Sequence, residues 1–491
     1  MTAKRYEPVA SQDQPASGRP PQRHQEFQRD LTAPTLTLLT VGGVMGSGLF
    51  MASGLAIRQA GPSVLWLYVL GALAMSWEIR ALAELSIAVP SPGSFLVVTR
   101  TVLGPAWLFV AGWIFWFSSV LTMSSEVTAA ALFTRYWFPE IALWIWSLSY
   151  SVLIVAINFV SVRGFGAIED VMAGVKALAV LAFIAVGGLA LLGGLGLRRR
   201  LPANALHLAL FRSGWLPHGW LGAAPALLLV LFAYAGTGVI GLAAAETQAP
   251  TVTLPKSVRQ TTALVVVMYL GSIFMILSLV PWNRQTDTVS PFVSALHAIS
   301  LPFAPFVMNV VLLFAVLSTM NAALYANVRV LYSLAKQGEA PKILGRLNGK
   351  GLPANATWAS AGLLALTILL AYVLPNKAYA YLVTATGFQA MFIWFVILLT
   401  QLRYRRHVAA HTNQTLGYKL WGSPFTTWFV MAVVVLALVL SPLAQGELFG
   451  AIIGSGGILA AWLIWWLVRR RRPDDPAPTI PPAPQADGAR R

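Results

Sequence analysis

The sequence contains no cysteine and few charged residues. The absence of cysteine from all 491 positions excludes disulfide bonds and thiolate metal sites. Only 10% of the residues are charged, whereas 57% are hydrophobic, which is far from the composition of an average soluble domain. Among the charged residues, acidic ones are the fewer, with 17 Asp and Glu against 34 Lys and Arg. The net charge is +17. These basic residues lie mostly between apolar runs and in the tails, so no nucleic-acid partner is expected.

Apolar runs of about 20 residues recur along the chain, the length that a helix needs to cross a lipid bilayer. They predict an all-α membrane protein with twelve transmembrane helices. The expected spans are 35–57, 63–88, 105–133, 141–160, 168–195, 222–245, 260–281, 304–332, 356–374, 380–402, 425–442 and 448–468. No cofactor is expected.

Most of the basic residues fall on the side of the N-terminus, which predicts that both termini are cytoplasmic and that the protein lies in the inner membrane. One outer loop opposes this rule, because it contains Arg198, Arg199, Arg200 and Arg212. Residues 1–30 and 472–491 are rich in Pro, Gln, Arg and Ala and are expected to be disordered cytoplasmic tails. No cleavable signal peptide is expected, because the first apolar run is too long.

The few ionisable residues within the spans are candidates for function. Arg80 and Glu84, with Glu78 nearby, are expected to pair on one helix face, as a structural ion pair or as part of an inner gate. Glu126 is expected either to bond to a neighbouring helix or to take part in proton or substrate chemistry. Lys176 is expected either to reach the cytoplasmic surface with its ammonium group or to keep that charge inside the bundle.

Two of the spans contain a cluster of glycines at mid-length. The clusters are Gly42, Gly43, Gly46 and Gly48 in span one, and Gly236, Gly238 and Gly241 in span six. Either cluster alone is more typical of helix packing through small residues. Their matched positions, five spans apart, favour two broken helices in a transporter built from inverted repeats. Spans one to five and six to ten would then form a core over residues 31–406, with spans eleven and twelve added at 407–471.

A series of motifs resembles the bacterial amino-acid permeases of the amino acid transporter (AAT) family, within the amino acid–polyamine–organocation superfamily. The motifs lie at 41–50, 60–62, 80–84, 90–95, 126–139, 166–176, 236–246, 290–293, 331–342 and 351–353. The resemblance implies a secondary active transporter, not an enzyme, that imports an amino acid by proton symport with alternating access. It also implies that Lys176 acts in proton coupling, in the place where related sodium-coupled transporters bind an ion. One departure is Gly238, where the family usually has a glutamate.

We expect the substrate to bind where the two broken helices open. N–H groups at 43–48 suit a carboxylate, whereas carbonyl groups at 41–43 and 234–236 suit an ammonium group. The residues expected to bind substrate are Gly43, Met45, Gly46, Ser47, Gly48, Ser119, Thr122, Phe232, Tyr234, Gly236 and Thr237, with Ser118 nearby. Because no carboxylate is certain to face this cavity, a neutral amino acid is favoured; Glu126 is the residue that can overturn this.

Other functions stay open on the sequence alone. A permease or exchanger for basic amino acids or polyamines is the main alternative. An amino-acid sensor that does not transport is less favoured, because the tails are short. A membrane enzyme would need clustered catalytic groups, and the six histidines lie in tails, loops or span ends without the spacing of metal ligands, so no metal site is predicted. The oligomeric state is left open.

Overall fold

The structure is a computed structural model that describes residues 31–89, 95–160, 163–192, 214–247, 249–348, 352–374, 377–411, 418–443 and 447–469. Within these ranges the chain is helical and has no β-strand; one isolated bridge joins Leu31 to Thr247. The expected disordered tails, residues 90–94 of the motif at 90–95, and the arginines of the loop 198–212 lie outside the described residues.

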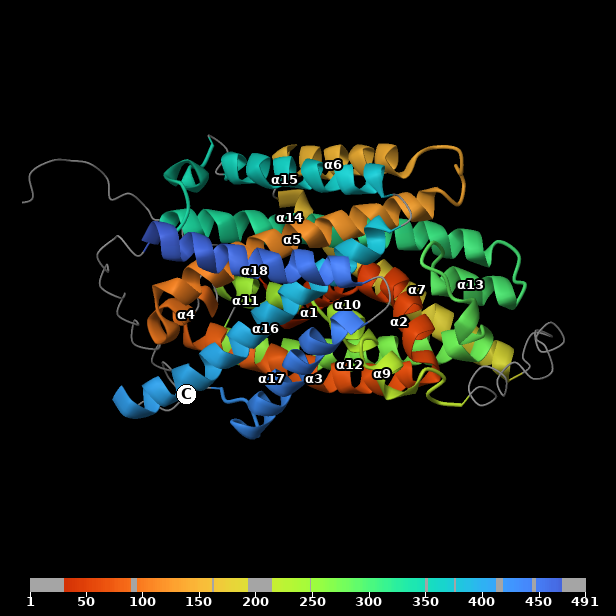
Figure 1. The fold of residues 1–491 in the computed structure, drawn as a ribbon, viewed down its shortest axis with the longest axis horizontal. Helices are drawn as coiled ribbons and strands as arrows, with labels where there is room; N and C mark the ends of the chain where they lie inside the picture. Colours follow the sequence, from red (N-terminus) through yellow and green to blue (C-terminus); the bar gives the residue numbers. More distant parts are fainter. Residues whose placement is uncertain are drawn as a thin grey trace, which may run out of the picture.

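The helices form one bundle in which most long helices run in a similar direction (Figure 1). The α-helices are α1 (Ala33–Val44), α2 (Ser53–Ala60), α3 (Val64–Ala88), α4 (Phe95–Leu103), α5 (Pro105–Thr134), α6 (Leu143–Val160), α7 (Arg163–Leu191), α9 (Gly219–Ala223), α10 (Ala226–Ala233), α11 (Gly238–Leu242), α12 (Pro250–Leu279), α13 (Pro291–Ala298), α14 (Ala304–Lys336), α15 (Ala354–Val373), α16 (Ala378–His411), α17 (Phe425–Leu440) and α18 (Leu448–Arg469). Every expected span overlaps at least one of them. Among the described residues, 9 helical segments are long and apolar enough to cross a membrane.

The first and sixth spans are interrupted near their middles. In span one, α1 ends at Val44, and the chain resumes as a π-helical turn, η1 (Gly48–Ala52), that continues into α2. In span six, α10 ends at Ala233 and α11 begins at Gly238. The interruptions therefore lie at 45–47 and 234–237, within or next to the two glycine clusters.

The two interrupted spans pack among the long helices of the bundle. Helix α5 packs along α14, and α1 packs against α7, α12 and α14. Helices α6 and α15 form a pair at one edge of the bundle (Figure 1). The apolar faces that meet at the centre are almost fully buried, so the two interruptions lie inside protein, where irregular backbone is tolerated at membrane depth.

Two short helices occupy equivalent places in the chain order. Helix α4 lies between the helices of spans two and three, and α13 lies between those of spans seven and eight. They lie at opposite ends of the bundle (Figure 1). Ser290, at the start of α13, donates a hydrogen bond of 2.7 Å to the carbonyl of Phe50 in η1, which connects this helix to the interrupted first span.

The structure corrects the expected pairing of Arg80 with Glu84. The Glu84 carboxylate is instead bound by Arg405, through Nε and Nη2 at 2.7 Å each, and by the backbone N–H of Leu420 at 2.6 Å. Arg80 donates to the hydroxyl of Ser76. The reason is that α16 packs against α3 and brings a guanidinium into two-point contact with the buried carboxylate, which is a strong form of charged hydrogen bonding.

Candidate functional site

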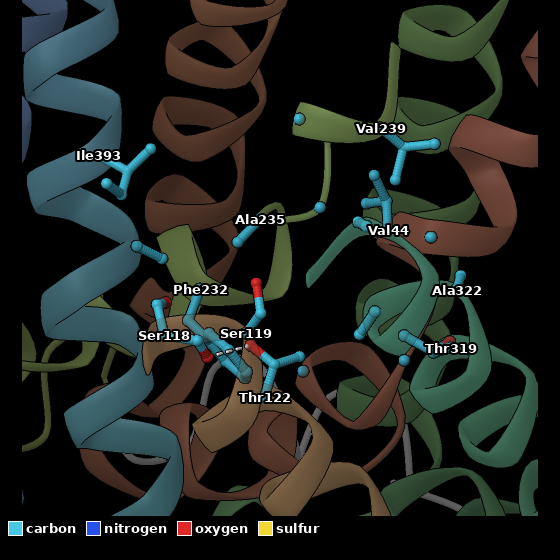
Figure 2. Close-up of a pocket in the computed structure, with 18 of the residues that line it drawn as sticks. Val44, Ser118, Ser119, Thr122, Phe232, Ala235, Val239, Thr319, Ala322 and Ile393 are labelled. Atoms are coloured by element: carbon cyan, nitrogen blue, oxygen red, sulfur yellow. Dashed lines mark hydrogen bonds between the residues drawn. The ribbon is translucent and has the colours of Figure 1, made fainter. Parts of the chain in front are cut away.

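A cavity of about 130 Å³ lies between the two interrupted helices and α3, α5, α14 and α16 (Figure 2). It is lined by Gly43, Val44, Gly46, Gly48, Glu78, Phe115, Ser118, Ser119, Thr122, Glu126, Phe232, Ala235, Gly236, Gly238, Val239, Thr319, Ala322, Ala323, Ala326, Ala390, Ile393, Trp394 and Ile397. The wall is mainly apolar, with a few hydroxyl groups from α5 and two carboxylates. A concave, buried site with a small number of polar groups is typical of small-molecule binding.

At the first interruption, a carboxylate binds the exposed backbone. The N–H of Ser47 donates to both oxygens of Glu126, at 3.0 and 2.9 Å, and the Ser47 hydroxyl donates to Oε1 at 3.0 Å. This N–H is available because Ser47 precedes η1, where the helical bonds begin again. A side chain at Gly46 would collide with the same carboxylate, which explains the glycine at that position. A backbone N–H group at 43–48 therefore binds a carboxylate, as expected. In this structure the carboxylate is that of Glu126 and not that of a substrate.

Lys176 lies inside the bundle. Its Nζ donates to the carbonyl of Gly42 at 2.9 Å and to Oγ1 of Thr319 at 3.0 Å, and the side chain is 1% exposed. Thr319 in turn donates to the carbonyl of Met45 at 3.0 Å. The ammonium group thus links α7 to the end of α1 and to α14. Of the two alternatives for Lys176, the structure therefore has the charge inside the bundle and not at the cytoplasmic surface.

The two interruptions touch each other. Gly236 has φ +107°, and a Cβ atom there would lie 2.5 Å from the carbonyl oxygen of Gly43. Only glycine combines this backbone conformation with so close an approach. Gly238 differs, because a Cβ atom at that position would meet only the ring of Phe115, at 3.6 Å, an ordinary contact distance.

Glu78 is a lining residue that the sequence did not assign to the site. It is fully buried, and its Oε2 accepts a hydrogen bond of 2.8 Å from Oγ1 of Thr237, at the second interruption. Its Oε1 has no hydrogen-bond partner among the described residues. Its position near Arg80 suggested the cytoplasmic end of the span, but residues two apart on a helix point to roughly opposite sides. The spacing of two residues therefore could have predicted that Glu78 lies on a different face of the helix from Arg80.

Most of the residues expected to bind substrate line the cavity. They are Gly43, Gly46, Gly48, Ser119, Thr122, Phe232 and Gly236, together with Ser118 and Glu126. Ser118, Ser119 and Thr122 come from one helix, and Phe232 lies beside them (Figure 2). Met45, Ser47, Thr237 and Lys176 do not line the cavity, although the last three bind groups around it.

The structure corrects the expected place of Tyr234. Its hydroxyl donates to the carbonyl of Tyr68 at 3.0 Å, and its ring stacks on Tyr269 with the centroids 4.7 Å apart. The Tyr269 hydroxyl lies within hydrogen-bond distance of the carbonyls of Val44, at 3.1 Å, and Ala233, at 2.8 Å. The tyrosines therefore support the two interruptions from behind, and Tyr234 does not face the cavity.

Half of the carbonyl groups expected to hold an ammonium group are in use. The carbonyl of Gly42 binds Lys176 and Thr319, and the carbonyls of Val41 and Gly236 accept from the N–H groups of Met45, at 2.9 Å, and Val239, at 3.3 Å. This narrows the set of free acceptors that these segments were expected to offer. The polar partner Thr319 lies on a distant helix and carries no local motif in the sequence.

Comparisons with known proteins show the family to which the chain belongs. The model of the family described as "Amino acid permease" matches residues 35–475. An uncharacterized amino acid permease of Bacillus subtilis, YtnA, is 34% identical over 444 residues, which cover 90% of this chain and 94% of the relative. A probable GABA permease of Pseudomonas aeruginosa is also 34% identical, over 86% of this chain and 89% of the relative. The gamma-aminobutyric acid permease of Escherichia coli is 31% identical, over 90% and 96%.

A solved structure shares the fold. A single-residue mutant of the manganese transporter of Eremococcus coleocola aligns with a TM-score of 0.57 over 89% of this chain and 95% of that chain, at 15% sequence identity. Because the sequence identity is only 15%, the similarity shows a shared fold and nothing about function.

Proposed function

Since the chain belongs to the amino acid permease family, we propose that it is a secondary active transporter that imports a net-neutral amino acid across the inner membrane by proton symport with alternating access. Family membership and the apolar helices make it a multi-pass membrane transport protein and not an enzyme. The observation that carries the proposal is the contact of the Glu126 carboxylate with the Ser47 N–H at the first interruption.

The contact suggests how proton and substrate binding are coupled. The N–H of Ser47 is the group that suits the carboxylate of an amino acid, and Glu126 occupies it. Protonation of Glu126 removes its negative charge and weakens its hold on this N–H. The substrate carboxylate then takes that N–H. A proton and an amino acid therefore bind together, and release of one favours release of the other.

Lys176 supports this exchange in the proposal. Its ammonium group lies among the carbonyl of Gly42, the hydroxyl of Thr319 and the charge of Glu126. A fixed positive charge at this place holds α1 and α14 together, as a bound cation would. Loss or movement of its proton changes the contact between these two helices, which is the kind of rearrangement that alternating access requires.

The arrangement of the helices supports a core of two inverted repeats. Interruptions occur in the first and sixth spans, and α4 and α13 occupy equivalent places in the two halves but lie at opposite ends of the bundle (Figure 1). We therefore assign residues 31–406 to the repeats, with 407–471 as two additional spans and both termini in the cytoplasm.

Transport of a basic amino acid or polyamine, or exchange of such substrates, is the second candidate. It is favoured by one observation, the presence of two carboxylates, Glu78 and Glu126, in the wall of the cavity. Relatives named as GABA permeases favour the first candidate, because 4-aminobutyrate carries no net charge.

The test is uptake into liposomes that contain the purified protein. A panel of labelled amino acids is offered with and without a pH gradient that is alkaline inside. We expect the gradient to drive accumulation of neutral amino acids, and Lys176→Ala to abolish that accumulation. Lys256→Ala, which removes an exposed lysine, is the control and is expected to transport normally. Gradient-driven uptake that is unchanged in Lys176→Ala, or uptake confined to basic substrates, would contradict the proposal.

A further inference from the structure

Glu78 presents an unusual combination of burial and incomplete bonding. Its side chain is 0% exposed and lines the cavity, and only one of its two oxygens has a partner, the Thr237 hydroxyl at 2.8 Å. A buried carboxylate without its full set of partners is costly, and removing such a group from water is repaid only by a donor or a positive charge. The free oxygen of Glu78 therefore calls for a donor that enters the cavity.

An amino acid brings such a donor, because its ammonium group carries a positive charge and three N–H bonds. The backbone acceptors nearby are less suitable, because a neutral carbonyl binds an ammonium group less strongly than a carboxylate does. The carbonyls of Gly42, Val44 and Gly236 also already accept hydrogen bonds from protein groups. The other carboxylate in the wall, Glu126, is engaged by Ser47. Among the described residues, Glu78 Oε1 is the carboxyl oxygen in this wall that has no hydrogen-bond partner.

The two carboxylates contact different interruptions. Glu126 comes from α5 and meets Ser47, whereas Glu78 comes from α3 and meets Thr237, the residue before α11. A molecule in the cavity can thus direct its carboxylate to the Ser47 side and its ammonium group to the Thr237 side. This orders the substrate across the junction of the two broken helices.

We propose that Glu78 is the specificity-determining residue that binds the ammonium group of the transported amino acid. It supplies from α3 a carboxylate at the second interruption, where Gly238 leaves the helix start without a side chain. The inference rests on the proposed function, because it assigns the amino-group end of that same substrate site.

The experiment moves the carboxylate from one helix to the other. Binding of 4-aminobutyrate, L-alanine and L-lysine is measured with purified wild-type protein, Glu78→Gln, and the double variant Glu78→Ala with Gly238→Glu. Butyrate and propionate, which lack the amino group, serve as matched ligands. Gly238→Glu is structurally reasonable, because a Cβ atom at that position meets only Phe115 at 3.6 Å. The double variant with Gly238→Gln controls for size without charge.

We expect Glu78→Gln to weaken binding of the preferred amino acid about 10- to 100-fold, the usual effect of losing a charged hydrogen-bond partner. Binding of the deaminated acids should change little. Gly238→Glu should restore most of the loss in the Glu78→Ala background, and Gly238→Gln should not. Rescue by a carboxylate on another helix would also show that the loss is not caused by misfolding.

Two results would overturn the inference. Glu78→Gln that keeps the wild-type preference for the amino acid over its deaminated analogue would show that the ammonium group binds elsewhere. Equal loss of both ligands without rescue by Gly238→Glu would assign Glu78 a structural role only. Failure of the proposed function itself is recognised separately, because the wild-type protein would then bind neither 4-aminobutyrate nor L-alanine.

Discussion

Replacement of Gly236 by alanine is expected to disrupt the contact between the two broken helices. The new Cβ atom would lie 2.5 Å from the carbonyl oxygen of Gly43 and 3.1 Å from Cα of Val44, both backbone atoms that cannot rotate away. The backbone at this position also has φ +107°, which a residue with a side chain rarely adopts. The perturbation therefore combines a clash with conformational strain.

The two costs can be estimated separately. Strained backbone conformations cost about 1–3 kcal/mol, and overpacking of a tight interior costs about 1–3 kcal/mol. Together they amount to about 2–6 kcal/mol, enough to change the population of the native junction more than about tenfold. We expect a lower melting temperature in detergent and a loss of amino-acid uptake of at least that factor.

Gly238→Ala is the matched control, two residues away. Its Cβ atom would make only an ordinary contact with Phe115, at 3.6 Å. We expect a melting temperature close to that of the wild type, because the substitution introduces neither a clash nor strain. If Gly236→Ala behaved like Gly238→Ala, the close contact between the interruptions would not be needed, and this reading of the site would be refuted.

Three further predictions concern the surroundings of the site. Arg405→Ala leaves Glu84 buried without its charged partner and should destabilise the protein by about 3–5 kcal/mol in thermal unfolding, whereas an unchanged melting temperature would contradict the importance of this pair. Tyr269→Phe removes a hydroxyl that bonds the carbonyls at both interruptions and should lower the melting temperature and the uptake rate, whereas equal values in both assays would contradict the role given to it. Burial raises the pKa of Glu447 to about 7, against the hydrogen bond from Gln59, so the folded state favours the protonated carboxyl; its contribution to stability is present at low pH and is lost as the pH rises through 7. Glu447→Gln should therefore flatten the fall of the melting temperature between about pH 5 and pH 8, and an unchanged slope would refute this.

The sequence predicted the positions of the helices and of both interruptions because these depend on local properties. Apolar runs of fixed length determine where helices form, and clustered glycines weaken a helix wherever they occur. Gly46 and Gly236 mark the interruptions in the sequence and lie within them in the structure.

The sequence could not predict which side chains meet across the bundle. Glu84 binds Arg405, which is 321 residues away, and Tyr234 packs behind the junction because Tyr269 stacks on it. The offset of two residues from Arg80 could have shown that Glu78 lies on another helix face, but the partner it meets there depends on how α3 packs against α11. These contacts follow from packing between distant segments, for which the sequence has no local signal.

The coupling of proton and amino acid at Glu126 is tested most directly by one variant, Glu126→Gln. The amide keeps an oxygen that can accept from the Ser47 N–H, but it cannot take up and release a proton. In liposomes with an interior alkaline pH gradient, the wild-type protein should accumulate labelled amino acid, and Glu126→Gln should only equilibrate it while still exchanging labelled for unlabelled substrate. Accumulation by Glu126→Gln at the wild-type level would contradict the proposed coupling.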